Sequence, residues 1–203
     1  MRKNAITALL IFATAVVWAQ DFETRKKAYG ESYSLEYSKK YAEAAEKIKS
    51  VYNASDYTDN VRLGWLLYTA AKSTDALAYY EKAIALQPSS IEARLGIVYP
   101  LSALNKWDEV IKQYQEILKV DTKHSTALYR LGYIYYYRGQ FAEAKTYLST
   151  LVQTYPFDFD GLSLMGWNEL KLGNKAAAKD YFERALLNHP ADTSAAEGLK
   201  LSK

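Results

Sequence analysis

Aromatic side chains recur at a fixed interval along this sequence, and they are its strongest sign of binding chemistry. Trp65, Tyr99, Tyr133 and Trp167 form one column, with 34 residues between successive members. Tryptophan and tyrosine offer a rigid face for stacking and a polar tip for a hydrogen bond, so they concentrate where binding energy is greatest. The column therefore predicts a surface that holds a partner, in a chain where 19 of 203 residues are tyrosine.

Further aromatic residues extend the column along one helical face. Between residues 125 and 137, four tyrosines stand at positions i, i+4, i+7 and i+8, a spacing that places them on the same side of a helix. Shifting that face back along the chain by two of these intervals adds Tyr68 beside Trp65. The predicted partner-binding residues are Trp65, Tyr68, Tyr99, Tyr129, Tyr133, Tyr136, Tyr137 and Trp167, with Trp65, Tyr133, Tyr136 and Trp167 as the strongest anchors.

Residue types that carry out catalysis are sparse in the sequence. The absence of cysteine excludes disulfides, thiolate metal sites and a cysteine nucleophile. The sequence has no HExxH, no GxSxG and no glycine-rich phosphate loop. His124 and His189 fall in turns, 65 residues apart, where solvated side chains are expected. We therefore expect no catalytic residues, no metal and no cofactor.

Packing residues share the interval of the aromatic column. Small residues recur where two helices would cross and approach closely, and a large residue four positions later would fill the space between them. Proline recurs where a second helix must end. The columns are Gly64, Gly132 and Gly166; Ala76, Val110, Ala144 and Ala178; Tyr80, Tyr114, Leu148 and Phe182; Ala83, Ile117, Leu151 and Ala185; and Pro88, Pro156 and Pro190.

This pattern resembles the tetratricopeptide repeat family, in which each repeat is one helical hairpin. The best copy carries the resemblance in Leu131, Gly132, Tyr135, Phe141, Ala144, Leu151 and Pro156. The resemblance implies an all-α chain, a right-handed α-solenoid, with copies at 57–90, 91–124, 125–158 and 159–192. It also implies that the aromatic face lines a concave surface on which family members bind peptides or partner helices. The lysine, arginine and asparagine clamp of chaperone-binding members is not expected, because aromatic residues fill the central column.

Three regions depart from the regular copies. In 91–124, Gly96 sits two residues early and Pro100 is expected to interrupt and bend the first helix. Residues 20–56 predict a divergent helical hairpin, and 193–203 predict a C-terminal capping helix. The spacing from Ser194 to Glu197, and from Ser89 to Glu92, predicts a capping box at the start of a helix.

The first nineteen residues read as an export signal. A basic start at Arg2 and Lys3 precedes an apolar run, and the 15 residues from Ala5 to Ala19 are fewer than the roughly 20 that cross a bilayer. We expect cleavage after Ala19 and a periplasmic or secreted protein. The alternative is an uncleaved anchor, which would provide the only membrane contact.

Charge and repeats together indicate a function in binding. Removing Arg2 and Lys3 leaves 24 of the 26 basic residues against 23 acidic ones, so no nucleic-acid partner is expected. The sequence predicts a non-catalytic scaffold that binds a protein or peptide in an aromatic groove. Two alternatives stay open at this point: a module that self-associates as a homo-oligomer, and a module that binds a glycan.

Overall fold

The computed structural model describes residues 21–203, so the predicted signal peptide at 1–19 lies outside it. The described residues fall into two compact units, divided between Lys106 and Trp107. Unit 1 contains a helix at residues 21–37 and then α2 (Tyr41–Lys49), α3 (Tyr57–Thr69), α4 (Ser73–Leu86) and α5 (Ile91–Ala103). Unit 2 contains α6 (Trp107–Val120), α7 (Ser125–Tyr137), α8 (Phe141–Thr154), α9 (Phe159–Lys171), α10 (Lys175–Asn188) and α11 (Thr193–Leu201).

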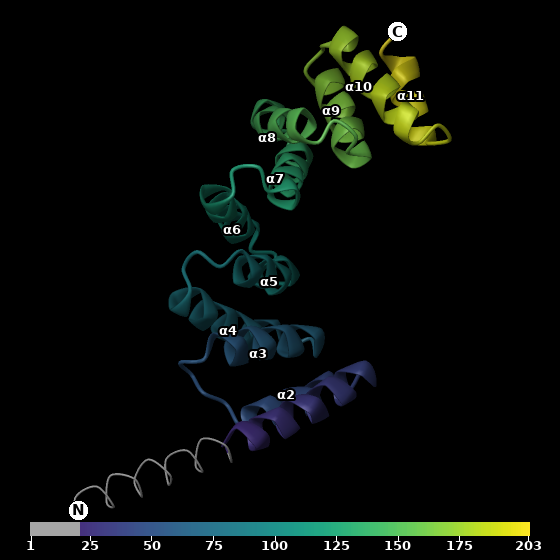
Figure 1. Ribbon diagram of the computed structural model, residues 1–203. Coiled ribbons are helices and arrows are strands. Elements are labelled where there is room, and N and C mark those ends of the chain that lie inside the picture. The colour runs from purple at the N-terminus through teal and green to yellow at the C-terminus, as the bar shows by residue number, and fades with distance from the viewer. Residues whose placement is uncertain (1–20) are drawn as a thin grey trace, which may run out of the picture. The chain divides into compact units, whose positions relative to one another are not determined.

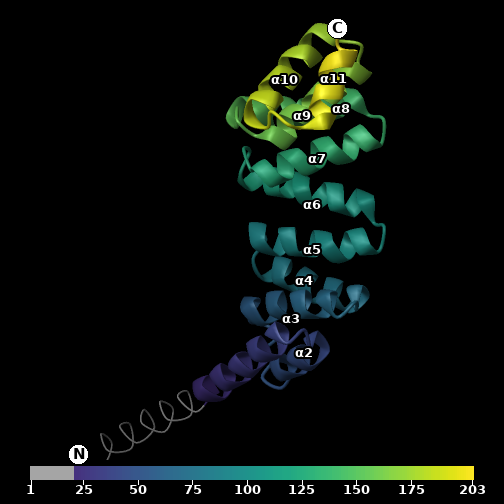
Figure 2. The same ribbon diagram turned by 90° about the vertical axis from the view of Figure 1, so that its right-hand side faces the viewer.

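Consecutive helices pair as hairpins in both units (Figures 1 and 2). The described part of the chain is all α-helical, as the sequence predicted. None of the helices within residues 21–203 combines the length and the apolar content needed to cross a bilayer. Each unit buries apolar side chains between its own helices.

Unit 1 has a core at the contact of α2, α3 and α4. Its fully buried members include Ile48 from α2, Leu63 and Leu66 from α3, and Ala76 from α4. The ring of Tyr68 packs against the edge of this core. The core thus fixes the helix that carries two of the predicted binding residues.

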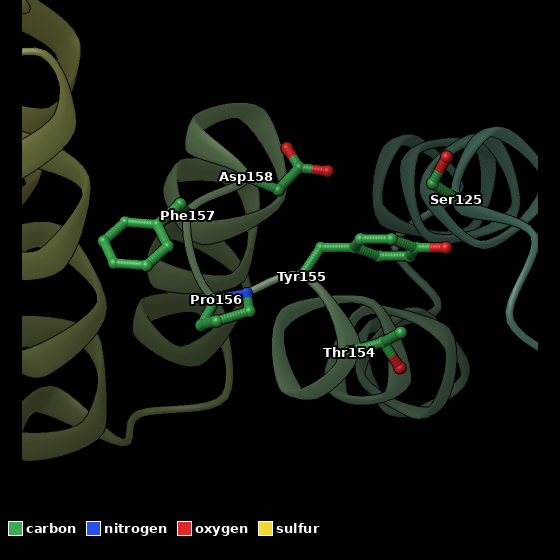
Figure 3. A pocket seen from close by; sticks show the side chains of 6 residues that line it. All are labelled: Ser125, Thr154, Tyr155, Pro156, Phe157 and Asp158. Atoms are coloured by element: carbon green, nitrogen blue, oxygen red, sulfur yellow. The ribbon is translucent and has the colours of Figure 1, made fainter.

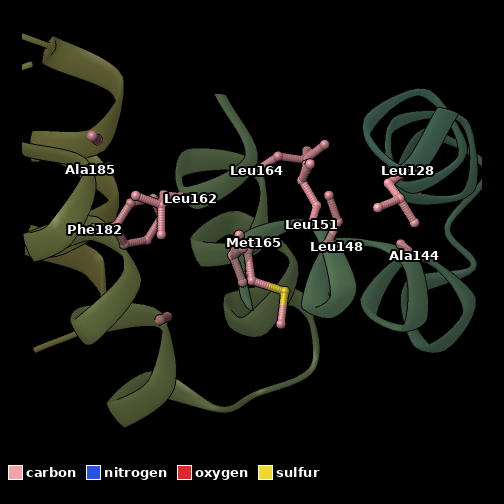
Figure 4. Close-up of a cluster of buried hydrophobic side chains, with 12 residues drawn as sticks. Leu128, Ala144, Leu148, Leu151, Leu162, Leu164, Met165, Phe182 and Ala185 are labelled. Carbon is pink, nitrogen blue, oxygen red and sulfur yellow. The ribbon is translucent and has the colours of Figure 1, made fainter. Parts of the chain in front are cut away.

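Unit 2 has a longer core that runs from α7 to α11 (Figure 4). Phe182 is its largest fully buried side chain, and Leu148, Leu151 and Met165 pack in the same cluster. Tyr135 of α7 stacks on Tyr147 of α8 with ring centroids 5.6 Å apart. One stripe of α7 therefore packs against α8, which leaves the other tyrosines of α7 on a separate face.

Glycines mark the helix crossings at the predicted positions. A Cβ atom on Gly64 would lie 2.8 Å from the ring of Tyr80, and one on Gly166 would lie 2.8 Å from the ring of Phe182. Real Cβ atoms do not approach so closely, so only glycine permits these crossings. The predicted reason for the glycine column is confirmed.

Gly96 belongs to the same packing scheme, although it sits two residues early in its copy. A Cβ atom there would lie 2.3 Å from Cε1 of Tyr80, on the hairpin before it. Gly198 of α11 lies in the same way against Phe182, at 2.2 Å. Each of these large rings is enclosed between two glycines, one from its own hairpin and one from the next helix.

Pro100 lies inside α5 and does not end it. The helix continues from Ile91 to Ala103 with Pro100 buried, so the predicted interruption was wrong. Proline removes one backbone N–H but keeps a helical φ, so a helix can run through this position. The predicted change of direction at this helix stays a prediction.

Aspartate and serine caps start several helices one or two residues from the predicted positions. Ser90, not Ser89, caps α5 by accepting a hydrogen bond from Ala93 N at 3.1 Å. Asp192, not Ser194, caps α11 by accepting from Ala195 N at 2.7 Å. Both predicted capping boxes were therefore placed at the wrong residues. The side chain that caps each helix belongs to the residue directly before its first turn, where its oxygen can accept from the free backbone N–H groups of that turn.

Candidate binding site

Three of the predicted binding residues come together in unit 1. Trp65 and Tyr68 project from α3, and Tyr99 projects from α5. The ring centroids are 6.1 Å apart for Trp65 and Tyr68, 6.2 Å for Trp65 and Tyr99, and 5.5 Å for Tyr68 and Tyr99. Trp65 is 37% exposed and Tyr99 is 50% exposed. These residues form the unit 1 aromatic cluster, part of which is exposed to solvent.

A carboxylate joins this cluster from the helix at residues 21–37. Glu36 Oε1 accepts a hydrogen bond from Trp65 Nε1 at 2.6 Å, and its Oε2 accepts from a terminal nitrogen of Arg62 at 2.5 Å. The other terminal nitrogen of Arg62 donates to Ser32 Oγ at 3.1 Å. The guanidinium carbon also lies 3.9 Å from the ring centroid of Tyr33. Sequence reasoning missed Glu36 and Arg62, since neither belongs to a repeating column.

Four tyrosines of α7 form a second aromatic surface, in unit 2. Ring centroids are 6.1 Å apart for Tyr129 and Tyr133, 4.5 Å for Tyr133 and Tyr137, and 5.3 Å for Tyr136 and Tyr137. We call them the α7 tyrosine cluster. Tyr137 is 68% exposed, whereas burial raises the pKa values of Tyr129, Tyr133 and Tyr136 above that of free tyrosine. The cluster therefore has a partly buried part and an exposed end, and the guanidinium carbon of Arg130 lies 5.9 Å from the ring centroid of Tyr129.

Trp167 packs differently from its counterpart Trp65. Its ring meets the buried ring of Phe182 edge to face, with centroids 5.2 Å apart, and its Nε1 donates to Ser194 Oγ of α11 at 3.2 Å. It contributes to the edge of the unit 2 core. The predicted column thus contains a residue whose visible contacts are structural.

The two histidines lie in turns, but each has a structural contact. His124 caps α7, where its Nδ1 accepts from Ala127 N at 3.3 Å. His189 stacks on Phe159 at a centroid distance of 4.3 Å. The expectation that both are simply solvated was therefore incomplete. Among residues 21–203, no three His, Cys, Asp or Glu side chains are placed to hold a metal ion.

An open depression of about 440 Å³ lies at the turn between α8 and α9. Figure 3 shows Tyr155 reaching across it towards Ser125, while Phe157 points the opposite way. The hydroxyl of Tyr155 donates to Lys123 O at 2.9 Å, which closes one side of the turn. Few polar groups face this depression, so it has little with which to orient a small ligand.

Sequence comparisons agree with this architecture. Models of the tetratricopeptide repeat match residues 60–90, 126–158 and 160–192. A tetratricopeptide repeat protein 21 homolog from Caenorhabditis elegans is 28% identical over 120 residues, which cover 59% of this chain and 9% of the relative. A TPR repeat-containing thioredoxin from Arabidopsis thaliana is 27% identical over 100 residues, which cover 49% of this chain and 15% of the relative. The chain thus spans less than a sixth of either relative.

Solved structures share the fold at low sequence identity. A tetratricopeptide repeat protein from Parabacteroides merdae superposes with a TM-score of 0.75 and 18% identity, over 88% of this chain and 72% of that one. MamA gives 0.72 and 19%, over 83% and 93%. YrrB, described as a TPR protein with an unusual peptide-binding site, gives 0.71 and 15%, over 93% and 97%.

These comparisons match the hairpins seen in each unit and the glycine crossings that hold them together. The family models cover the copies in which those glycines stand at the regular position, and leave out residues 91–124, where Gly96 comes early. The chain belongs to the tetratricopeptide repeat family.

Proposed function

We propose that this protein is a non-catalytic scaffold that binds an extended segment of a partner protein, outside the cytoplasm. The observation that carries the proposal is the unit 1 aromatic cluster, in which three rings from two helices meet and leave part of their surface exposed. Folding alone gains little from an exposed ring, whereas a ligand that covers it gains the burial of its apolar surface.

The chemistry of the two aromatic surfaces suits a peptide. Each ring pair adds about 0.5–1.5 kcal/mol beyond burial when it stacks with another aromatic group, and hydroxyl tips can bind backbone amides. The α7 tyrosine cluster presents adjoining aromatic rings with hydroxyl tips, so it favours an apolar or aromatic stretch of chain. The peptide-binding site named for YrrB supports this class of ligand by analogy of fold. The signal-like residues 1–19 support an exported location.

The test uses the mature chain from residue 20 as bait in an extract of the source's cell envelope. The Trp65→Ala/Tyr99→Ala variant removes two rings of the cluster. Phe157→Ala is the matched control, because Phe157 is 82% exposed and lies in a turn outside both aromatic surfaces. We expect the wild type and the control to retain the same partner protein and the double variant to lose it.

Other outcomes assign the surface differently. Light scattering of the same three proteins measures their mass in solution, and a dimer that only the double variant dissociates would identify self-association. Retention on envelope polysaccharide that only the double variant loses would identify a glycan ligand. Equal behaviour of all three proteins in every assay would remove the unit 1 aromatic cluster from the function.

A further inference from the structure

Arg62 is a buried cation with more hydrogen-bond donors than its surroundings use. Its side chain is 9% exposed, and its Nε finds no hydrogen-bond partner among the described residues. A buried guanidinium is stable only beside an anion, and a carboxylate can engage two of its N–H groups at once. Glu36 supplies that anion but contacts one terminal nitrogen through one oxygen. The cation therefore has unused capacity for a carboxylate.

Trp65 links this cation to the unit 1 aromatic cluster. Its indole N–H donates to the second oxygen of Glu36 while its ring meets Tyr68 and Tyr99. Arg62 and Trp65 thus hold one carboxylate between them, three residues apart on α3. A ligand with an acidic group next to an aromatic or apolar group would match both parts of this arrangement.

The carboxylate of Glu36, which lies between Arg62 and Trp65, can move away without unfolding a helix. Glu36 comes from 26 residues earlier in the chain and lies one residue before the helix at 21–37 ends. Its side chain is 23% exposed, so solvent already reaches it. The same helix keeps separate attachments to α3, since Arg25 forms ion pairs with Asp56 and Asp59.

We propose that Arg62 and Trp65 form a carboxylate-binding site, that Glu36 occupies it in the free chain, and that an acidic group of the partner segment takes its place. The inference rests on the proposed function, and it adds the chemistry of the partner. Glu36 is a tethered competitor, with an effective concentration in the millimolar range or above. A lone carboxylate therefore binds weakly, and the ligand must also stack on the cluster to displace Glu36.

The first test removes the competitor. Glu36→Ala deletes one methylene and the carboxylate, which is the equivalent of an acetate ion, and sodium acetate is the probe. Binding is followed by NMR through the indole N–H signal of Trp65, assigned by its absence in Trp65→Phe. We expect acetate to shift this signal saturably towards its wild-type position, with half-saturation at least about tenfold below that of the wild type. Acetamide, at matched ionic strength, leaves it in place.

Glu31→Ala is the control variant for this test. Glu31 lies on the same helix and pairs with Lys47 rather than with Arg62. Its removal leaves the acetate response at the wild-type level. If Glu36→Ala loses helix content by circular dichroism, Glu36→Ser replaces it, because serine is also too short to reach the Arg62 guanidinium and leaves the site open to acetate. No saturable response to acetate in a folded Glu36 variant would overturn the proposal.

The second test asks whether a ligand displaces Glu36 in the wild type. N-acetylphenylalanine carries a ring and a carboxylate, and N-acetylphenylalanine amide carries the ring alone. We expect the acid to bind at least about fivefold more tightly, and Glu36→Gln to widen that ratio. Equal affinities would mean that Arg62 and Glu36 are a permanent structural pair. That result overturns this inference alone, because the partner-capture test of the aromatic cluster would still stand.

Discussion

The buried carboxylate of Asp59 accepts hydrogen bonds from both terminal nitrogens of Arg25, at 2.9 and 3.1 Å, although Arg25 lies 34 residues earlier in the chain. The hydroxyl of Tyr29 donates to the same carboxylate, and so does Asn53 N at 2.8 Å. Asp59 is fully buried in α3. One side chain thus ties the helix at residues 21–37, and the loop that precedes α3, to the first regular repeat.

We predict that Asp59→Asn destabilises unit 1 by about 3 kcal/mol, because it leaves the Arg25 guanidinium without its main anion. Urea unfolding followed by circular dichroism measures the change. Glu46→Gln is the control, since Glu46 and Lys49 are an exposed pair that contributes little. A loss no larger than that of the control would show that Asp56 and water compensate the charge of Arg25.

This network could not be predicted from the sequence, whereas the repeats could. Periodicity reports which residues face the neighbouring helix, and that is how the positions of Gly64 and Gly166 foretold their crossings. Ion pairs such as Arg25 with Asp59, and Arg62 with Glu36, depend on how the divergent first hairpin docks. That hairpin lacks the repeating columns, so the sequence did not indicate which of its residues face the first regular repeat.

The enclosed rings give a prediction for the last helix. Gly198→Ala would place a Cβ atom 2.2 Å from Cζ of Phe182, whose ring is fully buried and would have to move. We expect a loss of about 2 kcal/mol in the free energy of unfolding. Gly30→Ala is the contrast, because nothing lies within 4 Å of its Cβ position.

Gly30→Ala should change the free energy of unfolding in the opposite direction and stabilise the protein. Gly30 lies inside the helix at residues 21–37, where alanine is favoured over glycine by about 0.8–1 kcal/mol. Thermal unfolding of both variants beside the wild type tests the pair. If Gly198→Ala were as stable as the wild type, α11 would not be held against Phe182.

The sequence did not predict one part of the packing, which is that a large side chain on one helix is matched by a small residue on the next helix. Gly96 looked irregular because it was compared with the glycine column, from whose position it is displaced by two residues. In the structure it makes room for Tyr80, as Gly198 does for Phe182. In the copy where the large residue is Leu148, the corresponding position is Leu164, which packs in the same core. Where the buried side chain is leucine instead of a larger aromatic ring, the neighbouring helix can therefore carry a leucine instead of a glycine.

The buried tyrosines predict a loss of stability at alkaline pH. Burial raises the pKa of Tyr80 and of Tyr57 above their ordinary value of 10.0. Above pH 10 the unfolded chain releases protons that the native chain keeps, so their contribution is full below pH 10 and declines as pH rises. Each such tyrosine adds a slope of up to about 1.4 kcal/mol per pH unit.

Urea midpoints at pH 8, 10 and 10.5 measure this decline. Tyr80→Phe removes one ionisable hydroxyl while keeping the ring, so its stability should fall less steeply with pH than that of the wild type. Tyr37→Phe is the control for loss of a tyrosine hydroxyl from the surface, because Tyr37 is 93% exposed. Parallel curves for all three proteins would contradict the assignment of the slope to burial of Tyr80.

The two tryptophans of the aromatic column should separate stability from binding. Trp167 packs edge to face on Phe182 and donates to Ser194, so Trp167→Ala should destabilise unit 2 by about 2–3 kcal/mol. Trp65→Ala should cost less, about 1 kcal/mol, because Trp65 is 37% exposed. Ser194→Ala removes only the acceptor of the Trp167 indole and should cost about 1 kcal/mol or less. Urea unfolding gives these values, and partner retention is measured on the same proteins. A Trp167→Ala variant that keeps wild-type stability and loses the partner would make Trp167 a binding anchor, as the column alone suggested.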